Sequence, residues 1–196
     1  MNTKLDEQLV LKYPKIFKDR HADMKSTCMC WGFECGDGWY MLLNLLCRDI
    51  QEHIDNIERN NELSKEHNEA KIAAKAGDFT KLEAYWSNSS KEFIEKQKHL
   101  AIKGELCKIY EAPQITAVQV KEKFGGLRFY FHGGDKFIEG LVSFAESMSY
   151  HICETCGTTL EVGQTEGWIR TICRQCLEEL QKESGVKSFV WNENES

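Results

Sequence analysis

Four cysteines near the C-terminus form two CxxC pairs, Cys153-Glu-Thr-Cys156 and, sixteen residues later, Cys173-Arg-Gln-Cys176. Both cysteines of such a pair can point into one tetrahedral site, because a tight turn bends the backbone around a metal ion. Two pairs supply the four thiolates of a closed structural site, and the gap between them suits a β-hairpin. The spacing therefore predicts one structural Zn²⁺ with no open position for catalysis, held by Cys153, Cys156, Cys173 and Cys176.

Cysteine usage and hydropathy favour a metal over disulfides. The chain of 196 residues has nine cysteines, an odd number. Its first residues lack the apolar core of a secretory signal, and no apolar run approaches the roughly 18 residues of a membrane span. We therefore expect reduced thiols, a cytoplasmic location and no membrane contact.

The charge of the chain bears on its partners. The formal net charge is −6. Affinity for the phosphate backbone of DNA depends on Lys and Arg, so an acidic chain disfavours sequence-specific DNA binding. A protein partner, a small ligand, or mimicry of a polyanion suits this charge at least as well.

Two helical segments are predicted in the first part of the chain. Apolar residues recur at helical spacing over 39–59, with Asp37 placed to cap the helix start. The polar segment 60–112 predicts a helical hairpin that Pro113 closes. We expect breaks in this segment at residues 76–78 and 87–89, and a capping box at Ser89–Glu92.

The strongest β signal lies at about 114–132, where Gly125-Gly126 separates two β-prone runs. Two central glycines favour a two-residue hairpin turn, since both can take φ > 0. A helix capped by Asp135 follows, to about residue 150. The predicted fold is α+β, with helices packed on a small antiparallel hairpin sheet and a C-terminal zinc module. The expected core, zinc module and tail span residues 1–150, 151–185 and 186–196.

The sequence of the zinc module predicts a treble-clef-like arrangement. Gly157 follows the second cysteine, where the turn around the metal needs φ > 0. Residues 168–173 are β-prone, and Cys176 opens a helix whose positive dipole end favours thiolates. The module resembles the zinc fingers of the DnaK-suppressor/TraR family of RNA-polymerase-binding proteins, and also the GATA-type finger. A treble clef by itself says little about function.

One face of the predicted hairpin is basic. With Gly125-Gly126 at the centre of the turn, Lys123 would face Arg128, Lys121 would face Tyr130, and Gln119 would face His132. Like charges directly opposite each other destabilise a strand pair, so an anion or an acidic partner is one explanation. The other is a solvated face neutralised by nearby Glu. The candidate binding residues are Lys121, Lys123, Arg128, Tyr130 and His132.

The N-terminal cysteines allow three interpretations. Cys28, Cys30, Cys35 and Cys47 could form a second metal site with irregular spacing. Cys35 could instead be a catalytic thiol assisted by Asp37, near a helix start that lowers its pKa. The third interpretation treats them as small buried apolar residues beneath aromatic side chains.

Three blocks together resemble a group of small uncharacterised proteins encoded by tailed bacteriophages: Glu34-Cys-Gly-Asp-Gly-Trp39, Val120-Lys-Glu-Lys-Phe-Gly-Gly-Leu-Arg-Phe-Tyr130 and the double CxxC. The resemblance covers roughly a third of the chain. It implies a phage accessory protein in the bacterial host cytoplasm. We expect a non-enzymatic protein that binds and modulates a host factor of defence or transcription. The alternatives are sequestration of an anionic ligand such as a signalling nucleotide on the basic face, and a cysteine- or metal-dependent enzyme built on Cys35 and Asp37.

Overall fold

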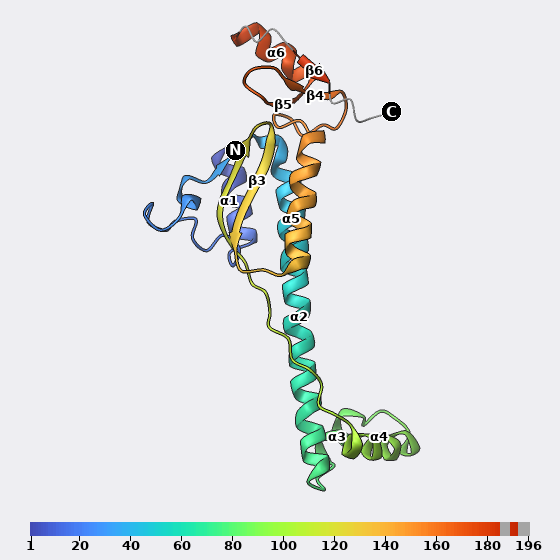
Figure 1. The fold of residues 1–196 in the computed structure, drawn as a ribbon. Coiled ribbons are helices and arrows are strands. Elements are labelled where there is room, and N and C mark those ends of the chain that lie inside the picture. Colours follow the sequence, from blue (N-terminus) through green and yellow to red (C-terminus); the bar gives the residue numbers. More distant parts are fainter. Residues whose placement is uncertain (185–188, 192–196) are drawn as a thin grey trace. The chain divides into compact units, whose positions relative to one another are not determined.

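The computed structural model describes residues 1–184 and 189–191, and the chain forms two compact units (Figure 1). The first unit combines residues 1–52 and 113–196, and the second comprises residues 53–112. Helices and small sheets are both present, so the α+β prediction is confirmed at this level. None of the helices in the described part of the chain combines the length and apolar character needed to cross a bilayer.

The sheet of the first unit has three strands in the order β1-β2-β3. The hairpin of β2 (Thr116–Lys123) and β3 (Gly126–His132) is antiparallel, as expected, but β1 (Phe33–Glu34) adds a parallel strand. The predicted antiparallel hairpin is therefore confirmed, and the parallel third strand was not predicted. Phe33 pairs with Val120, which brings the N-terminal cysteine-rich loop onto the sheet edge.

Apolar side chains from both ends of the chain form the core of this unit. The ring centroid of Phe17 lies 5.0 Å from that of Phe33 and 6.4 Å from that of Phe129. Helix α5 (Lys136–Met148) packs on β3 and begins as predicted, because the Asp135 carboxylate accepts the amide N–H of Ile138 at 3.0 Å. Other fully buried members are Leu9, Ile16, Trp39, Leu43, Ile50, Leu127 and Ile138.

The N-terminal helix α1 (Thr3–Lys12) is joined to the loop that follows it by a partly buried ion pair. The Arg20 guanidinium donates to both carboxylate oxygens of Asp6 at 2.9 Å and to the carbonyl of Cys30 at 3.0 Å. Two short 3₁₀ helices follow, η1 (Cys28–Trp31) and η2 (Asp37–Trp39). Asp37 does not cap the next helix as predicted, because its carboxylate accepts two hydrogen bonds from Asn2 instead.

Helix α2 is longer than expected, running without a break over Tyr40–Lys75. The predicted break at residues 76–78 is confirmed. Helix α3 (Thr80–Tyr85) and helix α4 (Lys91–Lys103) follow, separated at the second predicted break. The N-cap of α4 is Ser90, whose hydroxyl accepts the amide N–H of Phe93, so the capping box proposed one residue earlier is wrong.

Residues 104–112, the last part of the second unit, are not helical. The predicted helical hairpin over 60–112 is therefore wrong for this segment. Asn61 and Asn68 lie two turns apart on α2. Each binds the backbone of this segment through both the nitrogen and the oxygen of its side-chain amide. The Asn68 side chain donates to Cys107 O at 2.8 Å and accepts from Cys107 N at 2.6 Å, and Asn61 does the same for Tyr110. A small core lies nearby, made of Ala70, Ala74, Leu82 and Ala101 with Phe79 and Trp86 packed against it.

The C-terminal segment 153–184, called the finger below, belongs to the first unit. Its strands β4 (Val162–Thr165) and β5 (Thr171–Cys173) form an antiparallel hairpin, and helix α6 (Arg174–Ser184) follows. Strand β6 (Phe189–Trp191) lies within the predicted tail and pairs antiparallel with β4. The rest of that tail, residues 186–188 and 192–196, falls outside the described residues.

Candidate metal centre

The four cysteines of the two CxxC pairs meet in space, as the sequence predicts. Cys153 and Cys156 lie in the loop before β4, Cys173 ends β5, and Cys176 lies in the first turn of α6. Their four sulfurs all lie within 4.8 Å of one another. Among the side chains that the structure describes, this is the one group of three or more potential ligands close enough to hold a metal ion.

The donor set fits a tetrahedral ion. Metal–sulfur bonds of about 2.3 Å in a tetrahedron would place neighbouring sulfurs about 3.8 Å apart. The sulfurs of Cys156 and Cys173 are 3.7 Å apart, and all nine cysteines of the chain are free. That separation is far longer than a disulfide bond of about 2.05 Å. Four thiolates fill such a site, so no position remains open for a substrate.

The loop of the first pair has the geometry of a metal-binding turn. Gly157 adopts φ +81°, as the sequence predicts, and its amide N–H donates to the carbonyl of Cys153 at 2.8 Å. Burial opposes ionisation of the Cys153 thiol. Backbone N–H groups of Cys156, Cys173 and Thr155 donate to its sulfur and outweigh that effect, so the pKa of Cys153 lies below its ordinary value. Both halves of the finger thus direct amide groups at this thiolate.

The second pair resists ionisation. Burial raises the pKa of both Cys173 and Cys176, and the neighbouring thiols raise that of Cys176 further. Four sulfurs so close together repel one another as thiolates. A bound divalent cation reverses this balance, because it deprotonates the thiols that coordinate it. Ionisation of these thiols is therefore coupled to the binding of a cation.

The Glu34–Trp39 block docks directly on the metal-binding turn. The amide of Gly38 donates to the carbonyl of Glu154 at 2.8 Å, and the amide of Gly36 donates to the Glu154 side chain at 2.8 Å. The indole N–H of Trp39 donates to Ile152 O at 3.0 Å. Sequence reasoning missed this contact, although the Gly-x-Gly spacing was a signal of close backbone approach.

The tip of the β2–β3 hairpin also contacts the finger, at β5. The Thr171 hydroxyl on β5 donates to the carbonyl of Gly125 at 2.6 Å, and this bond is buried. Gly126 lies against the Tyr150 ring, where an added Cβ would overlap the ring. The Glu34–Trp39 block and the tip of the β2–β3 hairpin therefore both contact the segment that carries the cysteine cluster.

The hairpin register differs from the prediction. The turn is centred on Phe124 (φ 55°) and Gly125 (φ 76°) rather than on the two glycines. Lys121 consequently faces Arg128, Lys123 faces Gly126, and a bulge near Val118 sets His132 opposite Thr116. The predicted pairs Lys123–Arg128, Lys121–Tyr130 and Gln119–His132 are therefore wrong, although two cations still oppose each other.

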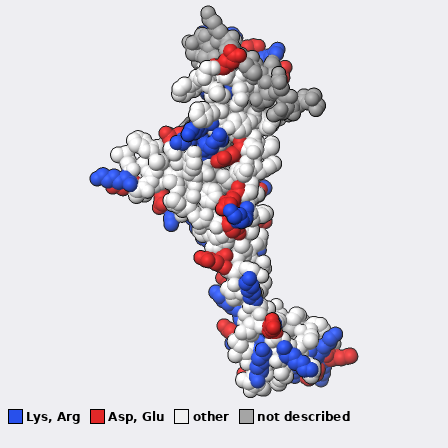
Figure 2. Space-filling view, in the orientation of Figure 1, with Lys and Arg blue, Asp and Glu red and all other residues white. Residues whose placement is uncertain are grey.

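The proposed basic face is only partly assembled. The Lys121 ammonium lies 5.7 Å from the centre of the Tyr130 ring, and Arg128 donates to the Tyr150 hydroxyl at 2.9 Å. His132 is the last residue of β3, at the end of the strand away from the turn. On the face drawn in Figure 2, acidic and basic side chains lie beside one another.

The N-terminal cysteines are spread over different environments. Cys28 is exposed, while Cys35 and Cys47 are buried, and the structure does not gather them into a metal-binding group. Burial raises the pKa of Cys35 to about 12, and Asp37 is occupied by Asn2. A thiol with so high a pKa is a poor nucleophile at neutral pH.

Comparison of the chain with models of protein families, with curated proteins and with solved structures found no match.

Proposed function

We propose that the four cysteines hold one structural zinc ion in a treble-clef finger, and that the chain is a non-enzymatic binding protein. A tetrahedral four-sulfur site suits zinc or an iron–sulfur cluster, and zinc needs no redox partner. The order of the elements supports the treble clef: a turn with two ligands, a β-hairpin, then a helix that carries the last ligand. A closed site supports a structural role over catalysis.

The binding partner that we propose is a host protein, in the cytoplasm of a bacterium that the phage infects. One observation carries this proposal: two blocks of the phage-protein resemblance, far apart in the sequence, both contact the segment that carries the third block, the double CxxC. Contact with this segment accounts for why the blocks occur together. The zinc ion then keeps a composite surface of core, hairpin and finger in one arrangement.

Affinity purification of the tagged full-length chain from bacterial cells tests this function. We expect one host protein at close to stoichiometric amounts, and its loss with Cys156→Ser, which removes a zinc ligand. Cys28→Ser is the matched control, because Cys28 is exposed and outside the cluster. Purification of the wild-type chain with no host protein near stoichiometry would count against the proposal.

A second candidate function is the binding of an anionic small ligand on the hairpin. It is favoured by the uncompensated cations Lys121 and Lys123. Among the described side chains, no carboxylate lies within ion-pair distance of either lysine. Ammonium groups without a carboxylate partner remain available to a phosphate. A nucleotide released by heating the purified protein, and lost in Lys121→Gln/Lys123→Gln, would support this candidate.

A further inference from the structure

Two turns of the first unit each expose an aromatic ring at the same cleft. Phe124, in the β2–β3 turn, is 65% exposed, and Trp168, in the β4–β5 turn, is 81% exposed. Both line a cleft of about 450 Å³ together with Glu122, Lys123, Gly167 and Ile169. Neither ring contributes to the core, so packing does not account for these residues.

The backbone at Phe124 points to a role for its side chain. Two-residue turns of this type place both central residues at φ > 0, where Asn-Gly or Gly-Gly is favoured. Phe124 adopts φ 55°, a conformation that is strained for a bulky residue. Strain of this kind collects at functional sites. The position therefore carries an aromatic ring despite the local preference of the turn.

The walls of the cleft are fixed to each other. The carbonyl of Gly125 accepts the buried hydrogen bond from Thr171, and the amide of Gly125 donates to the Glu122 carboxylate at 2.6 Å. A Cβ at Gly125 would lie 2.9 Å from the Ile169 side chain, so the two turns are in close contact. A cleft with walls already in place binds at a lower entropic cost.

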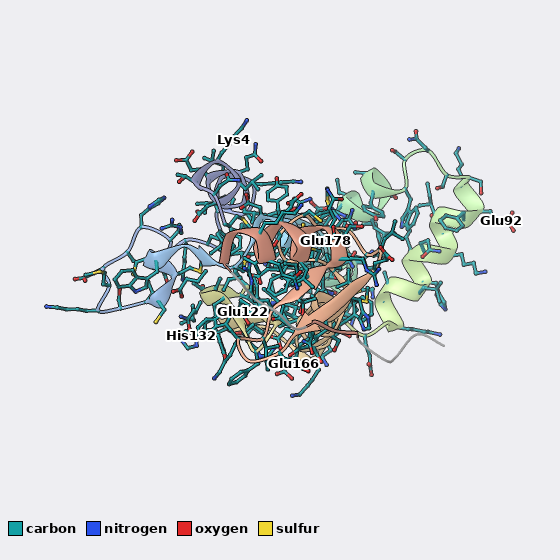
Figure 3. The ribbon with its side chains drawn as sticks, turned by 90° about the horizontal axis from the view of Figure 1, so that it is seen from above. Lys4, Glu92, Glu122, His132, Glu166 and Glu178 are labelled. Atoms are coloured by element: carbon teal, nitrogen blue, oxygen red, sulfur yellow. The ribbon has the colours of Figure 1, made fainter. Side chains whose placement is uncertain are left out.

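The charges around the cleft favour an anion on its hairpin side. The Lys123 ammonium lies 5.3 Å from the centre of the Phe124 ring, and Lys121 is two residues away on the same strand. The Glu122 carboxylate is engaged by the Gly125 amide. Glu166, labelled in Figure 3, is the acidic residue next to Gly167 in the finger turn. A phosphate is thus attracted to the hairpin side of the cleft by its lysines.

We propose that this cleft binds one nucleotide unit, with the base stacked on Phe124 and Trp168 and the phosphate held by Lys123 and Lys121. Aromatic rings beside cations are the usual means of binding unpaired bases. The cleft volume falls in the range of small-ligand sites. This inference rests on the second candidate function, and it adds the base-binding part of the site. The unit can come from a free nucleotide or from a single strand.

Binding assays on the full zinc-loaded chain test the proposal. The probes are adenosine 5′-monophosphate, inorganic phosphate, and a fluorescein-labelled ten-residue oligothymidylate, measured by calorimetry and by anisotropy at low salt. Trp168→Ala and Phe124→Gly each remove one ring, and glycine tolerates the φ of residue 124. Trp31→Ala is the matched control, because Trp31 is 64% exposed and lies elsewhere, in η1.

We expect either the nucleotide or the oligonucleotide to bind, and inorganic phosphate to bind much more weakly than either. Each ring-removing variant should weaken binding by about 5- to 150-fold, the range for one stacked base, while Trp31→Ala leaves it unchanged. Preference for the nucleotide identifies a free ligand, and preference for the oligonucleotide identifies a single strand.

Two results would overturn the inference. One is the absence of binding by any probe at millimolar concentration. The other is binding that Lys121→Gln/Lys123→Gln abolishes but the ring-removing variants leave unchanged; the ligand would then use the basic face alone, and the second candidate function would stand without the cleft. Capture of a host protein by the Trp168→Ala chain bears only on the first proposed function.

Discussion

Gly38→Ala tests the junction between the core and the metal-binding turn. A Cβ at this position would overlap the carbonyl oxygen of Cys153 and lie 2.5 Å from the amide nitrogen of Gly157. Both are backbone atoms of the turn, so neither can rotate away as the end of a side chain would. The substitution must therefore move the finger off the Glu34–Trp39 block.

The expected cost follows from the hydrogen bonds that this movement breaks. They are Gly38 N to Glu154 O, Gly36 N to the Glu154 carboxylate, and Trp39 Nε1 to Ile152 O. At about 1 kcal/mol for each bond, Gly38→Ala should lower the free energy of unfolding by about 3 kcal/mol. Urea unfolding of the zinc-loaded protein, followed by circular dichroism, measures this change.

Gly140→Ala is the matched control. Gly140 lies within α5, and no atom lies within 4 Å of the Cβ that alanine would add. Alanine in a helix interior is favoured over glycine by about 1 kcal/mol, so this variant should be more stable than the wild type. The junction would be refuted if the free energy of unfolding of Gly38→Ala lay within about 0.5 kcal/mol of the wild-type value while Gly140→Ala was stabilised.

Three further predictions concern the same unit. Thr171→Val removes the buried hydrogen bond to Gly125 O and should lower the free energy of unfolding by about 1–2 kcal/mol in urea titrations, whereas an unchanged value would contradict a locked hairpin tip. Phe124→Gly relieves the positive φ and should raise the unfolding free energy by up to about 1 kcal/mol; a clear loss would mean that the ring supports the fold. Hydrogen bonds from the Asn2 side chain and backbone lower the pKa of Asp37, so its stabilising effect is present above the unfolded value of 3.8 and is lost as pH falls through the folded value. Asp37→Asn should therefore cost less than about 1 kcal/mol at pH 7 and nothing near pH 2, and a cost that grows towards low pH would reverse this reasoning.

Local patterns in the sequence predicted the parts of the fold that depend on few residues. The CxxC spacing placed four sulfurs together, the Asp135 cap was confirmed, and the β-hairpin lies where alternating residues predicted it. Each of these depends on residues adjacent in sequence or on a metal-binding pattern of known spacing. Side-chain chemistry at short range is enough for such predictions.

The predicted register of the β-hairpin was wrong because glycine serves two different purposes in this turn. Gly125-Gly126 suggested a turn that exploits φ > 0 at both positions. Only Gly125 is used in this way, and Gly126 is needed because the Tyr150 ring occupies the space of a side chain. Gly38 likewise makes room for the finger. The sequence shows where the glycines are, but it does not show which distant residue packs against each of them.

The continuation of α2 and the end of the second unit were missed for a related reason. Asn61 and Asn68 look like ordinary polar residues of an exposed helix. Their amide groups instead replace the missing backbone partners of the non-helical segment at Cys107 and Tyr110. Buried backbone groups must be hydrogen-bonded, yet which side chain does so depends on tertiary structure.

Metal content tests the central claim most directly. Native mass spectrometry of the purified chain, with elemental analysis of the same sample, should give one zinc ion per chain. The Cys156→Ser chain should carry little zinc and unfold at a lower urea concentration, while Cys28→Ser retains both properties. A folded wild-type chain with no bound metal and four thiols that react freely at Cys153, Cys156, Cys173 and Cys176 would contradict the account.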